Sequence, residues 1–300
     1  MRRFLSFLII ILIILMSSCK SGGKEKDTFI PVFSTYKNDS SGAVAPVVKN
    51  EIFYGVLTPV EISGIFNRLG VPNRNTILNP TSNRNLYMSS SKASINTGIY
   101  GVDFGYLKIF GIGQEMIDYM VTIRDMSNKL GIPDSYLTDP IKRIESDIAE
   151  PDTIMFLMND SFNKMETHLR ESGRESTAGL MVMGGWVEAL YISTQLLYDP
   201  KNPDAEVIQR IAEQKYTLTT LLSFLKNYYD DPVVVYYSKK LKYLKNYFDT
   251  FDIYFKKGDL EIDLSKKVFR SSGSEMNVSV ETLNKIRDYV SSLRTEMVTP

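Results

Sequence analysis

The sequence predicts an all-α fold, built from antiparallel helical hairpins stacked as a bundle or short α-solenoid, with a small extended segment near residues 260–270. From residue 52 onward, apolar residues recur at spacings of three and four almost throughout. The loops between these stretches are mostly shorter than about ten residues, which favours antiparallel neighbours. Only after Gly258 does the pattern change, where LEIDLSKKVF alternates weakly like an edge strand or extended arm.

The first helix is predicted from its capping residues. Thr58 stands at the N-cap, Pro59 at the first helical position and Glu61 two residues further on, where a carboxylate can cap backbone N–H groups. The following stretch, residues 73–97, is polar and rich in Asn and Ser, and a short helix is expected at residues 82–93. A buried helix is then expected to begin near Ile99.

Apolar periodicity predicts the remaining helices. Gly131 and Pro133 stop the first of them, and DDP separates the two longest. The expected ranges are Gln114–Leu130, Thr138–Ala149, Asp152–Glu171, Glu175–Leu197, Pro203–Tyr228, Pro232–Lys256 and Ser279–Met297.

The start of the chain has the pattern of a secretory signal. Arg2 and Arg3 precede an apolar run from Phe4 to Met16, which is shorter than the ~20 residues of a membrane-spanning helix. The run ends LMSSC, and Cys19 is the only cysteine. This ending resembles the lipobox of bacterial lipoproteins, although Met16 stands where that motif usually has leucine. An uncleaved anchor or an ordinary signal peptide is the alternative interpretation.

The resemblance to lipoproteins implies a location for the protein. The signal peptide would be cut before Cys19, whose sulfur and new amino group would receive acyl chains such as palmitate, a firm lipid anchor in the membrane. Lys20 follows the cysteine, which by analogy with enteric bacteria favours the outer membrane. The expected organisation is a signal peptide at 1–18, a flexible tether at 19–50, a helical domain at 51–257, and at 258–300 an arm and final helix packed on the same domain.

The charge balance excludes one class of partner. Without Arg2 and Arg3 the mature chain keeps 33 of the 35 basic residues against 35 acidic ones, a net charge of −2. Such a chain lacks the basic footprint of a nucleic-acid-binding protein. The expected partners are the membrane, through the N-terminal lipid, and a protein of the cell envelope.

The helix expected at Glu175–Leu197 contains GLMVMGGWVEALYISTQ, which is apolar almost all round. Two adjacent glycines, Gly184 and Gly185, each cost roughly 0.5–1 kcal/mol relative to alanine in a helix. They indicate that another helix backbone or a ligand approaches closely. Gly101 and Gly105, four residues apart in GVDFG, are predicted to form a matching glycine face on an earlier helix.

Two interpretations of these helices stay open. In the first, the glycines serve close helix packing, and the buried carboxylates are satisfied by tyrosine hydroxyls, backbone N–H groups or an arginine, because unpaired ones would cost several kcal/mol. In the second, the helices enclose a small polar ligand pocket. Its candidate residues are Asp103, Tyr106, Glu188, Tyr191 and Gln195.

The same stretch carries a family resemblance. YGVDFGYL, QEMIDYM, NKLGI and GGWVEALYISTQ, within about residues 98–200, resemble a family of uncharacterised helical lipoproteins from Bacteroidetes-type bacteria. Phe104 stands where that family has leucine, and Ser193 where alanine is usual. The resemblance implies an envelope location and a helical fold. It implies no activity, because that family has none established.

Other patterns point to no catalytic or metal centre. His168 is the only histidine, so neither a histidine-based triad nor a zinc site has its partners, and no EF-hand or phosphate-binding glycine motif occurs. No cofactor is expected. An aromatic and basic stripe is interpreted as core-facing, with a membrane-surface or sugar-stacking role as the alternative. It comprises Tyr236, Tyr243, Tyr247, Phe251 and Tyr254.

Taken together, these patterns favour a non-enzymatic, acyl-anchored helical lipoprotein of the cell envelope that acts as a scaffold or binds a partner. The alternative is a small-molecule or glycan-binding lipoprotein with a pocket around Glu188 and Asp103. A hydrolase that uses this carboxylate pair would need both groups on either side of an open cleft.

Overall fold

Helices dominate the structure, and the all-α class predicted from the sequence is confirmed. The computed structural model describes residues 68–111, 113–146, 151–255, 260–263, 268–271, 274–276 and 278–300. The predicted signal peptide and tether lie outside these residues, as does the predicted first helix up to residue 67.

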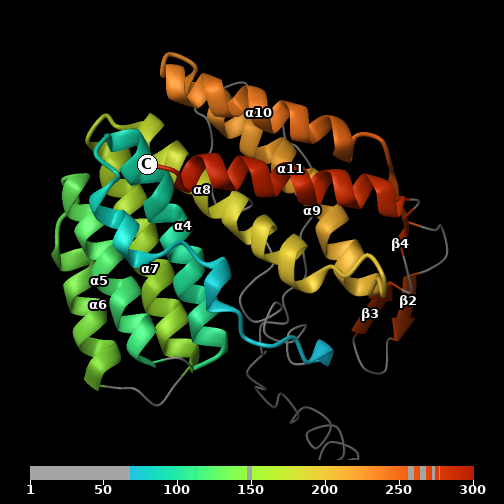
Figure 1. Ribbon diagram of the computed structural model, residues 1–300, viewed down its shortest axis with the longest axis horizontal. Helices are drawn as coiled ribbons and strands as arrows, with labels where there is room; N and C mark the ends of the chain where they lie inside the picture. Colours follow the sequence, from blue (N-terminus) through green and yellow to red (C-terminus); the bar gives the residue numbers. More distant parts are fainter. Residues whose placement is uncertain are drawn as a thin grey trace, which may run out of the picture. The chain divides into compact units, whose positions relative to one another are not determined.

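The helices follow one another with short connections as far as α10, and the strands lie between α10 and α11 in the chain (Figure 1). Three short 3₁₀ segments accompany them, η1 (Asn75–Ile77), η2 (Thr81–Asn85) and η4 (Lys226–Tyr228). The long helices are α4 (Ser90–Ile109), α5 (Gly113–Lys129), α6 (Ser135–Ser146), α7 (Pro151–Glu171), α8 (Glu175–Ile192) with its π-helical continuation η3 (Ser193–Leu197), α9 (Ala205–Leu225), α10 (Pro232–Phe248) and α11 (Val280–Val298).

Side-chain caps fix where several helices begin. Ser89 accepts a hydrogen bond from the Lys92 amide at the start of α4, and Asp231 does the same for Val233 at the start of α10. Each cap satisfies a backbone N–H that has no partner within the helix. At the other end of α5, Gly131 takes a positive φ of 62°, which ends the helix where the sequence predicted.

Two expected boundaries were wrong. The expected helix at residues 82–93 is instead the short 3₁₀ segment η2, followed by α4, which begins nine residues before Ile99 at Ser90. The Ser89 cap explains the early start. The helix expected to reach Lys256 ends at Phe248, and the chain continues as an extended strand.

Short antiparallel strands occupy the region of weak alternation. β1 (Ile253–Phe255) pairs with β4 (Ser274–Met276), and β2 (Leu260–Asp263) pairs with β3 (Val268–Ser271), so that Glu261 lies opposite Arg270. The small extended segment predicted near residues 260–270 is therefore present, as two pairs of short antiparallel strands between α10 and α11 in the chain.

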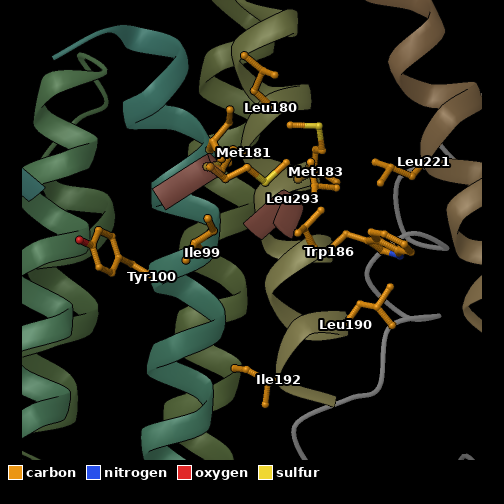
Figure 2. Packing of buried hydrophobic residues seen from close by; sticks show 14 of the residues in the cluster. Ile99, Tyr100, Leu180, Met181, Met183, Trp186, Leu190, Ile192, Leu221 and Leu293 are labelled. Atoms are coloured by element: carbon orange, nitrogen blue, oxygen red, sulfur yellow. The ribbon is translucent and has the colours of Figure 1, made fainter. Parts of the chain in front are cut away.

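Helix α8 lies at the centre of the packing, in contact with α4, α7, α9 and α11 (Figure 1). Its side chains point to several sides at once: Met181 lies towards α4, whereas Trp186 points towards Leu221 of α9 (Figure 2). The indole N–H of Trp186 donates to the Thr217 hydroxyl at 2.9 Å, which satisfies its buried polar atom. This all-round burial explains why the sequence of α8 lacks a polar face.

The stretch Glu175–Leu197 is also long and apolar enough to cross a membrane by length and composition. Within the structure 83% of its most apolar window is buried by other parts of the protein. A core helix meets the same criterion, and the packing of α8 is that of a core helix.

Two residues of the predicted aromatic stripe, Tyr236 and Tyr243, do not face the core, contrary to the interpretation of the sequence, whereas Tyr247 is half-buried and packs against the core. The side chain of Tyr254 lies outside the described residues. Tyr236 and Tyr243 keep 49% and 53% of their surface exposed. The core side of α10 is formed instead by residues such as Val234, Leu241 and Phe248, which lie on a different face of the helix. Phe251, beyond the end of α10, is buried as expected.

Candidate functional site

Helices α4 and α8 touch through their backbones at the predicted glycine pair. A Cβ atom placed on Gly184 would overlap the Ile95 carbonyl group, with the carbonyl carbon only 2.9 Å away. From the other side, a Cβ on Gly98 would overlap the Met181 carbonyl oxygen and lie 2.8 Å from the Gly185 nitrogen. Only glycine permits this approach, so a helix backbone occupies the space that the missing side chains leave.

The matching glycine face on α4 differs from the prediction. Gly98, which the sequence analysis did not single out, is the glycine of α4 that meets α8. Gly101 faces α7, because a Cβ there would collide with the ring of Phe162. Gly105 is buried on α4. Small residues at helix spacing identified the helices that pack closely, but not which glycine meets which neighbour.

Glu188 is fully buried and is held by an arginine from the final helix. Arg294 of α11 donates through Nε to Glu188 Oε2 at 2.9 Å and through Nη2 to Oε1 at 3.0 Å. The same Nη2 donates to the carbonyl oxygen of Ile77 at 3.2 Å, and the guanidinium carbon lies 4.7 Å from the centre of the Tyr191 ring. This is a two-pronged, charge-assisted contact that leaves the carboxylate paired.

Arg294 stays charged despite its position. Burial alone would lower its pKa, but the negative charge of Glu188 and their hydrogen bonds outweigh burial and raise the pKa above the usual value. Its side chain is almost completely buried, with only 9% of the surface exposed. An arginine was among the groups expected from the sequence to satisfy the carboxylates, but its position in the chain was not predicted.

Asp103 is the second buried carboxyl group, and its environment is different. Its Oδ2 accepts a hydrogen bond from the backbone N–H of Asn79 at 3.0 Å, whereas Oδ1 has no donor among the described residues. Burial away from water raises the pKa of Asp103 well above its usual value, and the nearby charge of Glu188 raises it further.

The charges at this centre balance only if one carboxyl group keeps a proton. Arg294 supplies one positive charge, while Asp103 and Glu188 would supply two negative ones. Since Glu188 holds the arginine and the pKa of Asp103 is raised, we infer that Asp103 is the group that keeps the proton, which can bridge to Glu188. The result is a neutral triad: a protonated aspartic acid, a carboxylate and a guanidinium.

Tyr106 and Gln195, the other two predicted pocket residues, form contacts elsewhere. The Tyr106 hydroxyl accepts a hydrogen bond from the Arg74 amide at 2.8 Å. Gln195 donates to the carbonyl oxygen of Arg287 at 3.2 Å, which ties the end of η3 to α11. Of the five predicted residues, the structure therefore gathers Asp103, Glu188 and Tyr191 around Arg294.

A second element of this centre, the buried Asn79, was not predicted from the sequence. Its side-chain amide donates to the Tyr87 hydroxyl and to Asn96 Oδ1, both at 3.0 Å, and its backbone carbonyl oxygen accepts from the Tyr119 hydroxyl at 2.9 Å. Asn79 thereby connects the segment before α4 to α4 and α5. Its position in a polar, Asn-rich stretch gave no periodic signal that could have marked it as buried.

The centre is closed around its charged groups. Asp103 and Glu188 both have no exposed surface. A shallow depression of about 250 Å³ lies nearby at the surface, lined by Pro80, Thr81, Ser82, Glu115, Asp118 and Tyr119, but neither carboxyl group lines it. The open cleft between two carboxylates that a hydrolase would need is therefore not formed by this pair.

Among the described residues, no group of His, Cys, Asp and Glu side chains has the composition of a metal site. The half-buried His168 lies edge-on against the ring of Tyr136, with ring centres 5.9 Å apart.

Comparison with known proteins adds no relative: no family model matches the chain, and neither curated proteins nor solved structures gave a significant match.

Proposed function

We propose that this protein is an acyl-anchored helical lipoprotein of the cell envelope, held in the outer membrane through Cys19, that works as a non-enzymatic scaffold by binding a partner on its surface. The observation that carries the proposal is the closed centre. Glu188 has no exposed surface and its partner is Arg294, a group of the protein itself. Because the residues that could have held a ligand serve the fold, binding is left to the outer faces of the helices.

The alternative is the small-molecule or glycan-binding lipoprotein with a pocket at Asp103 and Glu188. One observation favours it, namely that Asp103 Oδ1 has no donor among the described residues. A ligand would have to displace Arg294 from Glu188, which would break a buried ion pair and cost about 3–5 kcal/mol. A protonated Asp103 also explains why Oδ1 has no donor, and it requires no ion pair to break.

The anchor is tested by fractionating cells that express Cys19→Ala. We expect the wild-type chain in the membrane pellet and the variant in the soluble fraction, since the variant lacks the thiol that acylation needs. Metabolic labelling with a palmitate analogue should mark the wild-type chain alone. Retention of an unlabelled Cys19→Ala chain in the pellet, or a mature N-terminus upstream of residue 19, would contradict the lipoprotein assignment.

A further inference from the structure

The outer side of α10 and α11 carries a row of tyrosines. Tyr236 and Tyr243 are about half exposed, and Tyr243 contacts Tyr247 and Tyr289 with ring centres 5.5 and 5.2 Å apart. Tyr247 and Tyr289 also touch, at 5.9 Å. We call these four residues the tyrosine stripe. From Tyr236 to Tyr247 it follows α10 for about 16 Å, at 1.5 Å per residue.

Positive charge accompanies the stripe. Helix α10 contains four lysines and no acidic residue. The exposed Lys239 stands three residues after Tyr236 and four before Tyr243, so it is a surface neighbour of both rings. Lys240 lies over the Tyr236 ring at 4.9 Å and pairs with Glu296 at 2.8 Å, which holds that ring in place. The stripe therefore combines fixed aromatic surface with a cation at its edge.

The size of the stripe argues against a folded protein as its principal partner. A tyrosine side chain offers about 150–250 Å² when fully exposed, so two half-exposed rings present roughly 200 Å². A stable protein interface buries about 800 Å² on each side. A narrow row of rings suits a slender polymer whose units can lie along the helix.

Two other polymers or surfaces fit less well. A helix that inserts into a membrane surface presents Leu, Phe or Trp to the lipid, whereas Leu241, Leu244 and Phe248 of α10 are buried in the core. A nucleic-acid strand carries one charge per ~3.4 Å, or about five over this length. Beside the stripe, Lys240 and Lys245 already pair with Glu296 and Asp249, and a nucleic-acid strand draws most of its non-specific affinity from neutralised phosphates, whereas a sugar chain can bind mainly through its ring faces.

We propose that the tyrosine stripe binds a carboxylate-bearing polysaccharide, whose sugar rings stack on the exposed faces of Tyr236 and Tyr243 while Lys239 pairs with a carboxylate. Stacking on an apolar ring face supplies most of the contact, and the lysine supplies preference for an acidic chain. This inference rests on the proposed function, because it names the kind of partner that the surface of the protein takes.

The experiment titrates the detergent-solubilised full chain with oligogalacturonate and oligoalginate, and with oligogalacturonate methyl ester, which keeps the sugar but removes its charge. We expect both acidic oligomers to bind and the ester to bind at least about fivefold more weakly. Tyr243→Ala should weaken binding of the acidic oligomers about tenfold, and Lys239→Gln about threefold, with a smaller effect of added salt.

Tyr216→Ala is the matched control, because Tyr216 of α9 is 51% exposed and has no ring contact with the stripe. Binding and thermal melting of this variant should equal the wild type, and Tyr243→Ala should melt normally as well. The proposal is overturned if neither acidic oligomer binds, if Tyr243→Ala binds as well as the wild type, or if oligothymidylate or polyglutamate binds more tightly through Tyr243. None of these results would affect anchoring through Cys19, so the two proposals fail separately.

Discussion

The centre formed by α4, α8 and α11 and the outer side of α10 and α11 use the same kinds of residue in opposite ways. At the centre, tyrosines, carboxyl groups and an arginine are buried, and Glu188 and Arg294 satisfy each other. On the outer side, tyrosines and lysines meet solvent, and Tyr243 keeps 53% of its surface exposed. The comparison teaches that polar residues in a helix indicate a binding site only when the fold leaves them without an internal partner.

The largest expected effect belongs to the central ion pair. Glu188→Gln keeps the shape of the side chain but removes the carboxylate that holds Arg294 through two hydrogen bonds, and it leaves only the neighbouring Asp103 to supply a counter-charge by losing its proton. We expect a loss of about 3–5 kcal/mol in the free energy of unfolding, measured by denaturant titration. Lys245→Gln removes one partner of an exposed pair with Asp249 on α10 and should cost less than about 1 kcal/mol. Similar losses for the two variants would erase the distinction between centre and surface.

The helix contact should respond to a single methyl group. Gly184→Ala places a Cβ against the Ile95 carbonyl, whose backbone cannot move without shifting α4, so the variant should lose about 1–3 kcal/mol. Gly113→Ala is the matched control, because a Cβ there meets no atom within 4 Å at the start of α5. That control should be neutral or slightly stabilising. An unchanged thermal melt for Gly184→Ala would remove the close-contact argument.

The smallest effect distinguishes the two carboxyl groups of the centre. Because the folded-state pKa of Asp103 is raised, the folded protein keeps a proton that the unfolded chain loses as the pH rises above the usual aspartate range of about 4. Stability therefore falls with rising pH until the raised folded pKa is passed. Asp103→Asn imitates the protonated form, so it should cost less than about 1 kcal/mol near pH 5.

The measurement is the free energy of unfolding of both proteins between about pH 5 and pH 8. The wild type should lose stability over this range relative to Asp103→Asn, and the two curves should converge towards the acidic end. If the variant instead loses stability as severely as Glu188→Gln at every pH, then Asp103 is ionised in the folded protein, and the neutral triad is wrong.

Local patterns sufficed for much of the fold. Helices α5, α7, α8 and α11 begin and end within a few residues of their expected positions, because glycine, proline and capping residues mark their ends. Helix α4 was placed too late because its first two turns, SSKASINT, belong to a polar, Asn- and Ser-rich stretch in which only a short helix ending at Ala93 was expected, although Ala93, Ile95 and Asn96 are buried. Polar residues inside a helix that is buried all round give no periodic signal.

The candidate site was only partly predictable. The need for partners follows from burying Glu188 and Asp103, but the identity of the partner does not, since Arg294 is 106 residues away from Glu188 in the chain. The spacing of the tyrosines on α10 predicted that they share one face of the helix, but it did not predict whether that face meets the core or the solvent. The core side of α10 was decided by Val234, Leu241, Leu244 and Phe248, a second stripe on the same helix.

The large separation of Arg294 from Glu188 along the chain has a consequence for folding during synthesis. A nascent chain contains the acid of α8 long before the ribosome reaches the codon for residue 294, so the neutral triad cannot assemble until α11 has emerged. Until then the packed centre would hold an acid with no counter-charge, which disfavours premature compaction.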